Sequence, residues 1–200
     1  MKNSGSAHVG GFSGFVFKNR FTWLALVMVL GIAADQASKI WAQRNLTTSY
    51  QVSEGETKYY GNRTVVVVPG AFNLVYKENS AAAFSLTSSF PDWFRKPFLI
   101  IISALATIFF IIWYFRLKSP DGLLMSSFSF ILAGAMGNFA DRIRMGYVID
   151  FLDVYGGILG YPQAHWPTFN IADSLIVIGA IGVVIRTLIP GGEAGAINKK

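Results

Sequence analysis

Residues 97–115 read PFLIIISALATIFFIIWYF, an apolar stretch that contains no charged residue. A helix that crosses the hydrocarbon core of a bilayer needs about 20 predominantly apolar residues. Three further stretches are long and apolar enough for this, at 21–40, 122–140 and 169–189. Four such segments leave too little polar surface for a soluble chain of this length. The sequence therefore predicts an all-α membrane protein with four transmembrane helices, forming a single integral membrane domain over residues 1–200.

The amino-acid composition supports a membrane protein and argues against several functional classes. Of 200 residues, 52% are hydrophobic and only 14% are charged, whereas soluble domains usually carry about 25% charged residues. The chain has no cysteine, which excludes disulfides, thiolate nucleophiles and cysteine–zinc sites. Its net charge of +6 comes from scattered Lys and Arg rather than from a basic run, so no nucleic-acid partner is expected.

The distribution of basic residues predicts the orientation of the chain. Cytoplasmic segments of membrane proteins carry an excess of Lys and Arg. Here these residues are enriched in the N-terminal arm, in the short link after 97–115 and in the C-terminal tail. We therefore expect both termini in the cytoplasm, and the connecting segments 41–96 and 141–168 on the outer side. The tryptophans fall at or just beyond the ends of the predicted helices, as in an aromatic belt: Trp23, Trp41, Trp93, Trp113 and Trp166.

The first outer segment contains a pattern that is typical of short β-strands. Residues 64–76 read TVVVVPGAFNLVY. Two β-branched or aromatic runs flank Pro69 and Gly70, a pair that favours a turn. The sequence therefore predicts a small β-sheet between the first and second helices, resting on the outer membrane surface.

Polar residues from distant parts of the sequence are predicted to lie at one depth, near the outer ends of the helices. Ionisable side chains inside a membrane are costly and often mark a functional site. The residues concerned are Asp35, Asn79, Asn138, Asp141, Arg142, Asp150, Asn170 and Asp173. Together they predict a polar site at the outer leaflet.

Metal-dependent and serine-dependent chemistry find little support among these residues. The two histidines, His8 and His165, are expected on opposite sides of the membrane, and one histidine with scattered carboxylates is a weak metal site. Ser38 and Lys39 are adjacent, but neighbouring side chains of a helix point about 100° apart and do not face each other as a Ser–Lys dyad would. Lys39 is instead expected to extend toward the interface and keep its charge in water. No metal or cofactor is therefore predicted.

Carboxylates remain as the predicted catalytic groups. An ionised aspartate can take a proton from a water that attacks an amide, while a protonated aspartate hydrogen-bonds the carbonyl oxygen and later protonates the leaving nitrogen. Two carboxyls that lie close together share one proton, because both cannot easily ionise. Asp173 follows Asn170 on one face of the first turn of a helix, and the positive end of that helix favours an ionised carboxylate. The candidates are Asp35, Asp141, Asp150, Asp153 and Asp173.

Five short motifs carry a resemblance to a known family. They read DQASK at 35–39, ENSAAAF at 78–84, GAMGNFADR at 134–142, VIDFLD at 148–153 and FNIAD at 169–173. In this order, on four predicted spans, they resemble the motifs of the lipoprotein signal peptidase (signal peptidase II) family of bacterial membrane aspartic proteases. The resemblance extends from Asp35 to Asp173, which is most of the chain.

The resemblance implies a role for each polar residue of the predicted site. It assigns the catalytic pair to Asp150 and Asp173, contacts with the substrate backbone to Asn79 and Arg142, positions beside the pair to Asn138 and Asn170, and supporting roles to Asp35, Lys39 and Asp141. The spacing alone does not decide between Asp141 and Asp150, so the family match makes that choice.

The same resemblance implies the substrate, the partners and the location. The substrate would be an exported prolipoprotein whose lipobox cysteine already carries diacylglycerol, and the enzyme would cut just before that cysteine. This precursor and membrane lipid are the implied partners, the enzyme would act as a monomer, and neither a cofactor nor a metal is required. It would lie in the bacterial cytoplasmic (inner) membrane with its active site near the outer leaflet.

Two departures from the family pattern concern the surroundings of the site. The family commonly has Gly two residues after the Asn of its second motif, where this chain has Ala81. A Gly that is needed for a positive φ would resist this change. The segment 153–169 is also longer than usual, and we expect it to alter the rim that meets the substrate. Neither departure touches the carboxylates.

Two other functions remain alternatives from the sequence. A small ion or proton transporter would use Asp35 and Asp173 as relay carboxylates, and it would need charges near mid-membrane with access from both sides. A non-catalytic assembly protein would use the polar residues to bind a partner helix. The acids of this chain cluster near one rim, which favours the peptidase.

Overall fold

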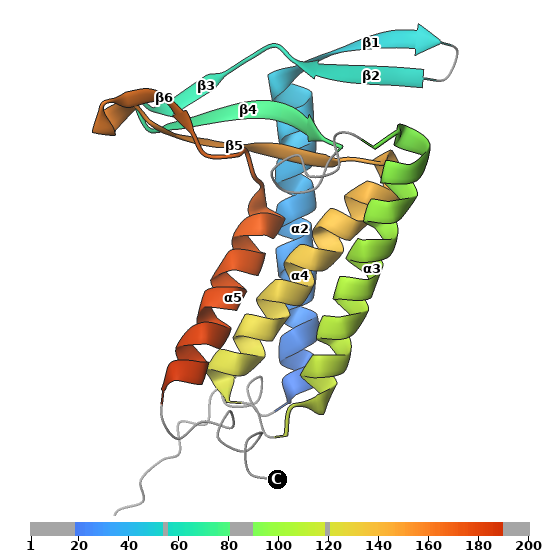
Figure 1. Cartoon of the computed structure of the whole chain (residues 1–200), viewed down its shortest axis with the longest axis vertical. Helices are drawn as coiled ribbons and strands as arrows, with labels where there is room; N and C mark the ends of the chain where they lie inside the picture. Colours follow the sequence, from blue (N-terminus) through green and yellow to red (C-terminus); the bar gives the residue numbers. More distant parts are fainter. Residues whose placement is uncertain (1–18, 54–55, 81–89, 119–120, 190–200) are drawn as a thin grey trace, which may run out of the picture.

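The helices of the computed structural model form a bundle that carries a small β-sheet across one end (Figure 1). The structure describes residues 19–53, 56–80, 90–118 and 121–189. In this part of the chain, 4 helices are long and apolar enough to cross a membrane, which confirms the predicted fold class. They are α2 (Arg20–Leu46), α3 (Asp92–Arg116), α4 (Gly122–Met145) and α5 (Ile171–Leu188).

The helix ends differ from the predicted ones for local reasons. α2 continues past residue 40 because Ala42 and Leu46 are buried against the sheet. α4 runs on to Gly146, whose φ of 79° lies in the left-handed region that glycine tolerates. α5 starts later than predicted because Asn170 caps it, with its side chain accepting a hydrogen bond from the backbone N–H of Asp173.

α4 is the central helix of the bundle. Its most apolar stretch is 61% buried, against 11–17% for the other three helices. α5 packs closely on it, since a Cβ at Gly134 would lie 2.2 Å from the carbonyl oxygen of Ala172 and one at Gly179 would lie 2.4 Å from that of Ser127. Glycine at these positions therefore allows the two backbones to approach. The outward faces of α2, α3 and α5 remain apolar and exposed, as contact with lipid requires.

The sheet is antiparallel, and its strands come from two separate parts of the chain. In spatial order they are β3 (Val65–Val68), β4 (Phe72–Asn79), β5 (Val148–Gly156) and β6 (Tyr161–His165). β3 and β4 confirm the strands predicted on either side of Pro69 and Gly70. β5 and β6 were not predicted. In β5, residues 148–151 are all buried, and such a strand lacks the alternation that marks a half-exposed one.

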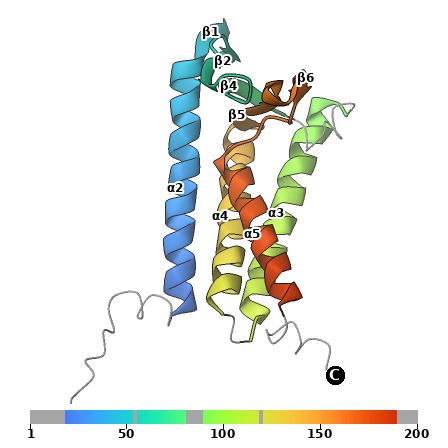
Figure 2. The same cartoon turned by 90° about the vertical axis from the view of Figure 1, so that its left-hand side faces the viewer.

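A separate hairpin extends the outer layer beyond the sheet. It consists of β1 (Thr47–Ser53) and β2 (Glu56–Gly61), and it follows directly from the end of α2. Figure 1 shows it projecting sideways from the top of the molecule. Figure 2 shows that the hairpin and the sheet lie at the same end of the bundle, where α2 and α4 finish.

The long segment 153–169 forms an ordered tongue at the edge of the sheet. It contains the end of β5, a short 3-10 helix η2 (Gly157–Leu159) and β6. Nδ1 of His165 lies 2.8 Å from Oδ1 of Asp153, and its ring stacks on Tyr155 with the centroids 5.1 Å apart. These contacts tie β6 to β5. The other departure, Ala81, lies outside the described residues.

The pairing of β4 with β5 brings two distant segments to one place. In the register of these strands, Lys77 lies opposite Asp150 and Asn79 lies opposite Val148. The C-terminal end of α2 packs against the same strands through one buried cluster, which comprises Ala42, Leu46, Tyr76, Ile149 and Phe151. The sheet therefore fixes the polar end of β4 over the C-terminal ends of α2 and α4.

Candidate active site

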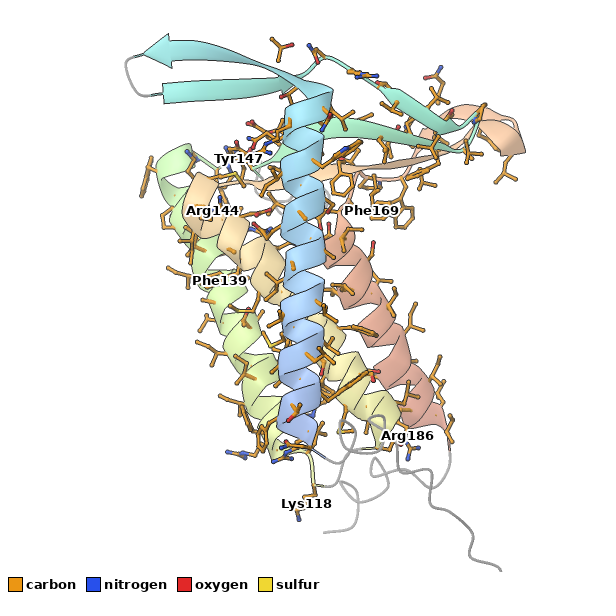
Figure 3. All side chains as sticks on the ribbon, turned by 180° about the vertical axis from the view of Figure 1, so that it is seen from behind. Lys118, Phe139, Arg144, Tyr147, Phe169 and Arg186 are labelled. Carbon is orange, nitrogen blue, oxygen red and sulfur yellow. The ribbon has the colours of Figure 1, made fainter. Side chains whose placement is uncertain are left out.

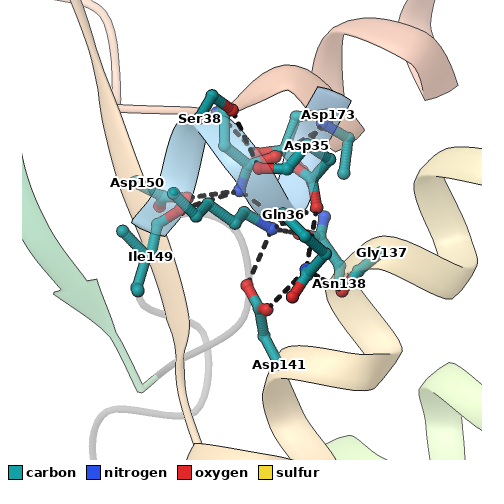
Figure 4. A network of polar contacts seen from close by, with 12 residues as sticks. Asp35, Gln36, Ser38, Gly137, Asn138, Asp141, Ile149, Asp150 and Asp173 are labelled. Carbon is teal, nitrogen blue, oxygen red and sulfur yellow. Dashed lines mark hydrogen bonds and ion pairs between the residues drawn. The ribbon is translucent and has the colours of Figure 1, made fainter. Parts of the chain in front are cut away.

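The predicted polar residues come together between the sheet and the helices that it covers. Figure 4 shows Asp35 from α2, Asn138 and Asp141 from α4, Asp150 from β5 and Asp173 from α5 in one network of polar contacts. The structure thus gathers carboxyl groups from four elements at one end of the bundle. This arrangement differs from the mid-membrane charges that a transporter would need.

Asp173 is held by the first turn of its own helix. Its backbone N–H donates to Oδ1 of Asn170 at 3.0 Å, and its Oδ2 accepts a hydrogen bond from the backbone N–H of Asn170 at 3.2 Å. This reciprocal capping box fixes the rotamer of Asp173 at the start of α5. The positive end of the helix favours the ionised form of a carboxylate in this position.

Asp150 lies in a different environment, because its side chain is only 1% exposed. Its Oδ2 accepts a hydrogen bond from Nδ2 of Asn79 at 2.9 Å, and its Oδ1 accepts one from Nδ2 of Asn170 at 2.8 Å. Burial, with a smaller contribution from the charge of Asp173, raises the pKa of Asp150 to about 7 against the opposing effect of these hydrogen bonds. Asp150 therefore keeps its proton to a higher pH than an ordinary aspartate does.

Two asparagine amides connect the two carboxyls. Asn170 donates from Nδ2 to Oδ1 of Asp150 and also to Oδ1 of Asn138, the second contact measuring 3.2 Å. Asn138 in turn donates from Nδ2 to Oδ1 of Asp173 at 2.7 Å. Both asparagines are buried, at 0% and 6% exposure. The pair of carboxyls is thus held by side chains that themselves have little freedom.

Lys39 is buried, so the prediction that it extends toward the interface is wrong. Its side chain is 2% exposed, and its Nζ lies 2.9 Å from Oδ2 of Asp35 and 2.7 Å from Oδ2 of Asp141. Two buried carboxylates stabilise its charge where water cannot reach. Nζ also donates to Oδ1 of Asn138 at 3.0 Å. This ion cluster of Asp35, Lys39 and Asp141 therefore joins α2 to α4. It contacts the network of the paired carboxyls through Asn138.

Asp35 additionally links α2 to the beginning of α5. Its Oδ1 accepts a hydrogen bond from the backbone N–H of Ala172 at 3.0 Å. A Cβ at Gly137 would lie 2.6 Å from Oδ2 of Asp35, so the close contact requires glycine there. Gln36, which was not predicted, donates to Oδ1 of Asp141 at 2.8 Å and accepts from Arg144 at 3.0 Å. Its position within the DQASK motif could have indicated that Gln36 belongs to the site.

The Ser–Lys alternative is not assembled in this structure. Ser38 donates its hydroxyl hydrogen to the carbonyl oxygen of Asp35 at 2.8 Å. The ammonium group of Lys39 is occupied by Asp35, Asp141 and Asn138. Asp153, another candidate carboxylate, contacts His165 and accepts from Asn73 at 3.2 Å, so it belongs to the tongue. Among the described residues, no group of His, Asp and Glu side chains is arranged to hold a metal ion.

Arg142 supplies a half-buried positive charge next to the paired carboxyls. It interacts electrostatically with Asp173, Asp150 and Asp141. Its Nε is buried and has no hydrogen-bond acceptor within the part of the chain that the structure describes. A planar guanidinium with a donor available in such a site suits a carbonyl oxygen of a bound peptide.

Replacing Asp141 by Asn is expected to affect stability more than chemistry. Lys39 would keep Asp35 and Asn138 but lose one of its two counter-charges, which should lower the free energy of unfolding by about 3 kcal/mol. The kcat of the folded fraction should stay within about threefold of wild type. Thermal unfolding in detergent, together with turnover normalised to folded protein, tests this. A well-folded but inactive Asp141→Asn variant, beside an active Asp150→Asn variant, would reverse the assignment.

Transmembrane helices under a small sheet, with two linked carboxyls at their junction, define a membrane-embedded aspartic peptidase. Comparison with known proteins identifies the kind of peptidase. A family model described as Signal peptidase (SPase) II matches residues 27–189. The chain therefore belongs to the lipoprotein signal peptidase (signal peptidase II) family, which confirms the resemblance seen in its five motifs.

Individual relatives support this membership over most of the chain. A lipoprotein signal peptidase of Geobacter metallireducens is 38% identical over 81% of this chain and 88% of its own length. One of Syntrophotalea carbinolica is 36% identical over 83% of this chain and 90% of its own length. The chain thus covers nearly the full length of these relatives.

Solved structures support the fold independently. A chain from a structure described as a bacterial membrane enzyme, solved by the in meso method at 2.3 Å resolution, matches with a TM-score of 0.62 and 28% identity. The match covers 88% of this chain and 91% of that one. A second such structure, at 1.9 Å resolution, gives a TM-score of 0.60 with 29% identity over 84% and 93% of the two chains. The helices and the sheet are therefore arranged as in these bacterial membrane enzymes.

Proposed function

We propose that this protein removes the signal peptide from diacylglyceryl-modified prolipoproteins by cutting just before the lipidated cysteine, with Asp150 and Asp173 activating a water molecule. Membership of the signal peptidase II family supports the substrate class. The observation that carries the mechanism is the pair of carboxyls linked through Asn170 and Asn138, one buried and the other at a helix N-terminus.

In the proposed reaction, ionised Asp173 takes one proton from the water as its oxygen attacks the scissile carbonyl carbon. Protonated Asp150 hydrogen-bonds the carbonyl oxygen, on which negative charge develops. When the tetrahedral intermediate collapses, the C–N bond breaks and the leaving nitrogen receives the proton of Asp150. The products are a carboxyl-terminated signal peptide and the free amine of the lipidated cysteine. Transfer of the proton from Asp173 to Asp150 then restores the starting state.

Arg142 and Asn79 are the proposed contacts for the substrate backbone. Asn79 donates to Oδ2 of Asp150 at 2.9 Å, so a peptide bond near this carboxyl lies within reach of the same amide. Arg142 lies on α4, where its charge interacts with those of Asp150 and Asp173. Together these donors would hold an extended peptide across the two carboxyls without themselves exchanging protons.

The orientation proposed for the chain places this site at the outer leaflet. Figure 3 shows Lys118 and Arg186 at the end of the bundle opposite the sheet, whereas Arg144 and Tyr147 lie near the sheet. The basic residues at the end opposite the sheet suit the cytoplasmic face. Both termini of the chain would then be cytoplasmic.

A cluster of aromatic side chains at the start of α3 supports a site at the depth of the lipid headgroups. Phe94 stacks on Phe98 with centroids 5.6 Å apart, and Phe90 meets Phe94 edge-on at 5.3 Å. Trp93 beside them is 78% exposed. Tryptophan favours the headgroup region of a bilayer, where the peptide bond next to a membrane-anchored diacylglyceryl cysteine would also lie.

The substrate proposal is tested by two precursors with the same sequence, one carrying diacylglycerol on its cysteine and one unmodified. Purified protein in a bilayer mimic is expected to cut the lipidated precursor before the cysteine and to leave its twin intact. Product masses identify the cut. Equal cleavage of both precursors, or cleavage elsewhere, would contradict the proposed substrate class.

The proton on Asp150 should also set the upper pH limit of the reaction. Because burial raises its pKa to about 7, we expect kcat/KM to fall as the pH rises through about 7, where the acid is lost. The raised pKa has a parallel effect on folding. Its contribution to stability is full below the ordinary value of 3.8 and is lost as the pH rises through about 7. A rate that stays level up to pH 9 would contradict a protonated Asp150.

A further inference from the structure

The amide of Asn138 has a fixed orientation, which is set by hydrogen bonds from Lys39 and Asn170. Its Oδ1 accepts two hydrogen bonds, from Nζ of Lys39 at 3.0 Å and from Nδ2 of Asn170 at 3.2 Å. Its Nδ2 therefore faces Oδ1 of Asp173, at 2.7 Å. If this amide turned over, its oxygen would face the carboxylate of Asp173 and the hydrogen bond would be replaced by repulsion.

Both donors to Asn138 favour this orientation, and Lys39 is the charged one. Asn170 is held by its own contacts, because its Oδ1 accepts from the backbone N–H of Asp173 and its Nδ2 donates to Oδ1 of Asp150. An ammonium group offers donors only, and Lys39 has no room to withdraw, because Asp35 and Asp141 hold it at 2.9 Å and 2.7 Å. The oxygen of Asn138 must then point to Lys39.

We infer that Lys39 is a positioning residue for the hydrolysis, which acts through Asn138 to keep Asp173 oriented and ionised as the base. This inference rests on the proposed function of Asp150 and Asp173. It assigns the ion cluster a second role beyond joining α2 to α4. The buried charge of Lys39 would polarise the Asn138 amide and strengthen the hydrogen bond that the amide donates to Asp173.

The surrounding charges leave Asp173 dependent on this hydrogen bond. From α4 it faces the positive charge of Arg142, and from β5 it faces Asp150, whose pKa burial raises to about 7. Behind Asn138, the positive Lys39 lies between the negative Asp35 of α2 and Asp141 of α4. Loss of Lys39 would therefore leave Asp35 and Asp141 without their counter-charge and would remove the charged one of the two donors that hold the amide of Asn138.

The test compares Lys39→Met with Gln36→Met, a matched change in the same buried junction. Gln36 donates to Asp35 at 3.2 Å and to Asp141 at 2.8 Å, and its other hydrogen bonds go to Gly137 and Arg144. We expect Gln36→Met to lower the Tm while kcat and the pH profile stay at wild-type values. Lys39→Met should lower kcat of the folded protein about 100-fold, with KM within about twofold, and move the acid limb of the profile to higher pH.

A double-mutant cycle tests whether Lys39 acts through Asn138. If it does, Lys39→Met should lower kcat much less in an Asn138→Ala background than in wild type. If Lys39→Met alone fails to fold, Lys39→Met/Asp35→Asn/Asp141→Asn, which leaves no unpaired buried carboxylate, takes its place with the same measurements. A folded Lys39 variant with the kcat and acid limb of wild type would overturn the inference, as would full additivity with Asn138→Ala.

Asp150→Asn in the same assay separates this inference from the proposed function. If Asp150→Asn cleaves the lipidated precursor normally, the paired-carboxyl mechanism itself fails. The other outcome is an inactive Asp150→Asn beside a folded Lys39 variant that cleaves at the wild-type rate with the wild-type pH profile. In that case the paired-carboxyl mechanism is retained, and Lys39 has a structural role only.

Discussion

Replacing Asp173 by Asn is expected to lower kcat for the lipidated precursor by at least about 1,000-fold. An amide cannot take the proton from the attacking water, and no other carboxylate takes its place, because Asp35 and Asp141 are both bound to Lys39. The capping contact of residue 173 can survive, since an amide oxygen can also accept from the backbone N–H of Asn170, as Oδ2 does now. Single-turnover cleavage by the purified variant in a bilayer mimic measures the loss.

Ser38→Ala is the matched control for this experiment. Ser38 precedes Lys39 on α2, and its hydroxyl donates to the carbonyl oxygen of Asp35 rather than to any side chain of the ion cluster. Turnover by Ser38→Ala should equal that of wild type, while Asp173→Asn is folded and inactive. Cleavage by Asp173→Asn at the wild-type rate would exclude it as the base, and loss of cleavage in Ser38→Ala would revive a serine nucleophile.

Replacing Asp150 by Asn should lower kcat by a similar factor, about 1,000-fold, because the leaving nitrogen loses its proton donor. The effect on stability should depend on pH. Burial raises the pKa of Asp150 to about 7, so the wild-type protein carries a buried negative charge at pH 8 that the amide removes. The amide accepts only one of the hydrogen bonds from Asn79 and Asn170, so the Tm of Asp150→Asn should lie below that of wild type at pH 5 and closer to it at pH 8.

Thermal unfolding at pH 5 and pH 8 checks this, alongside the cleavage assay. The stability of Asp150→Asn relative to wild type should improve as the pH rises between these values. An inactive variant that is destabilised equally at both values would point to a structural role for Asp150. A fully active one would remove it from the mechanism.

The transmembrane helices could be predicted from the sequence because a helix in lipid must be apolar over its whole membrane-spanning length. A span needs about 20 apolar residues, and 97–115 and 122–140 show this without any structure. The strands after α4 could not be predicted in the same way. Residues 148–151 are all buried, so three apolar residues and Asp150 follow one another without the alternation of a half-exposed strand.

The polar site was predicted in composition but not in its internal contacts. Orientation and depth placed Asp35, Asn138 and Asp173 on one rim, since helix ends on one side of a membrane share a depth. The choice of Asp150 over Asp141 needed the family resemblance, because both were predicted on the same side of the membrane, close together in the sequence. In the structure, Asp141 contacts Lys39 and Gln36, whereas Asp150 accepts from Asn170, whose amide also donates to Asn138 beside Asp173.

Lys39 shows why the remaining error occurred. A lysine near the end of a span ordinarily extends to the interface. The sequence alone does not show that the ammonium group of Lys39 contacts two carboxylates. Asp35 lies one helical turn before Lys39, which was visible, but Asp141 comes from another helix. The burial of Lys39 depends on that tertiary contact.

Cleavage of the lipidated precursor in water enriched in oxygen-18 tests the central claim most directly. Wild-type protein is expected to release a signal peptide that ends immediately before the lipidated cysteine and carries a single heavy oxygen at its new carboxyl terminus, with no covalent adduct on the protein. Asp150→Asn and Asp173→Asn, both folded, should release none. A peptide-linked adduct on the protein, or the same labelled product from either folded variant, would contradict the account.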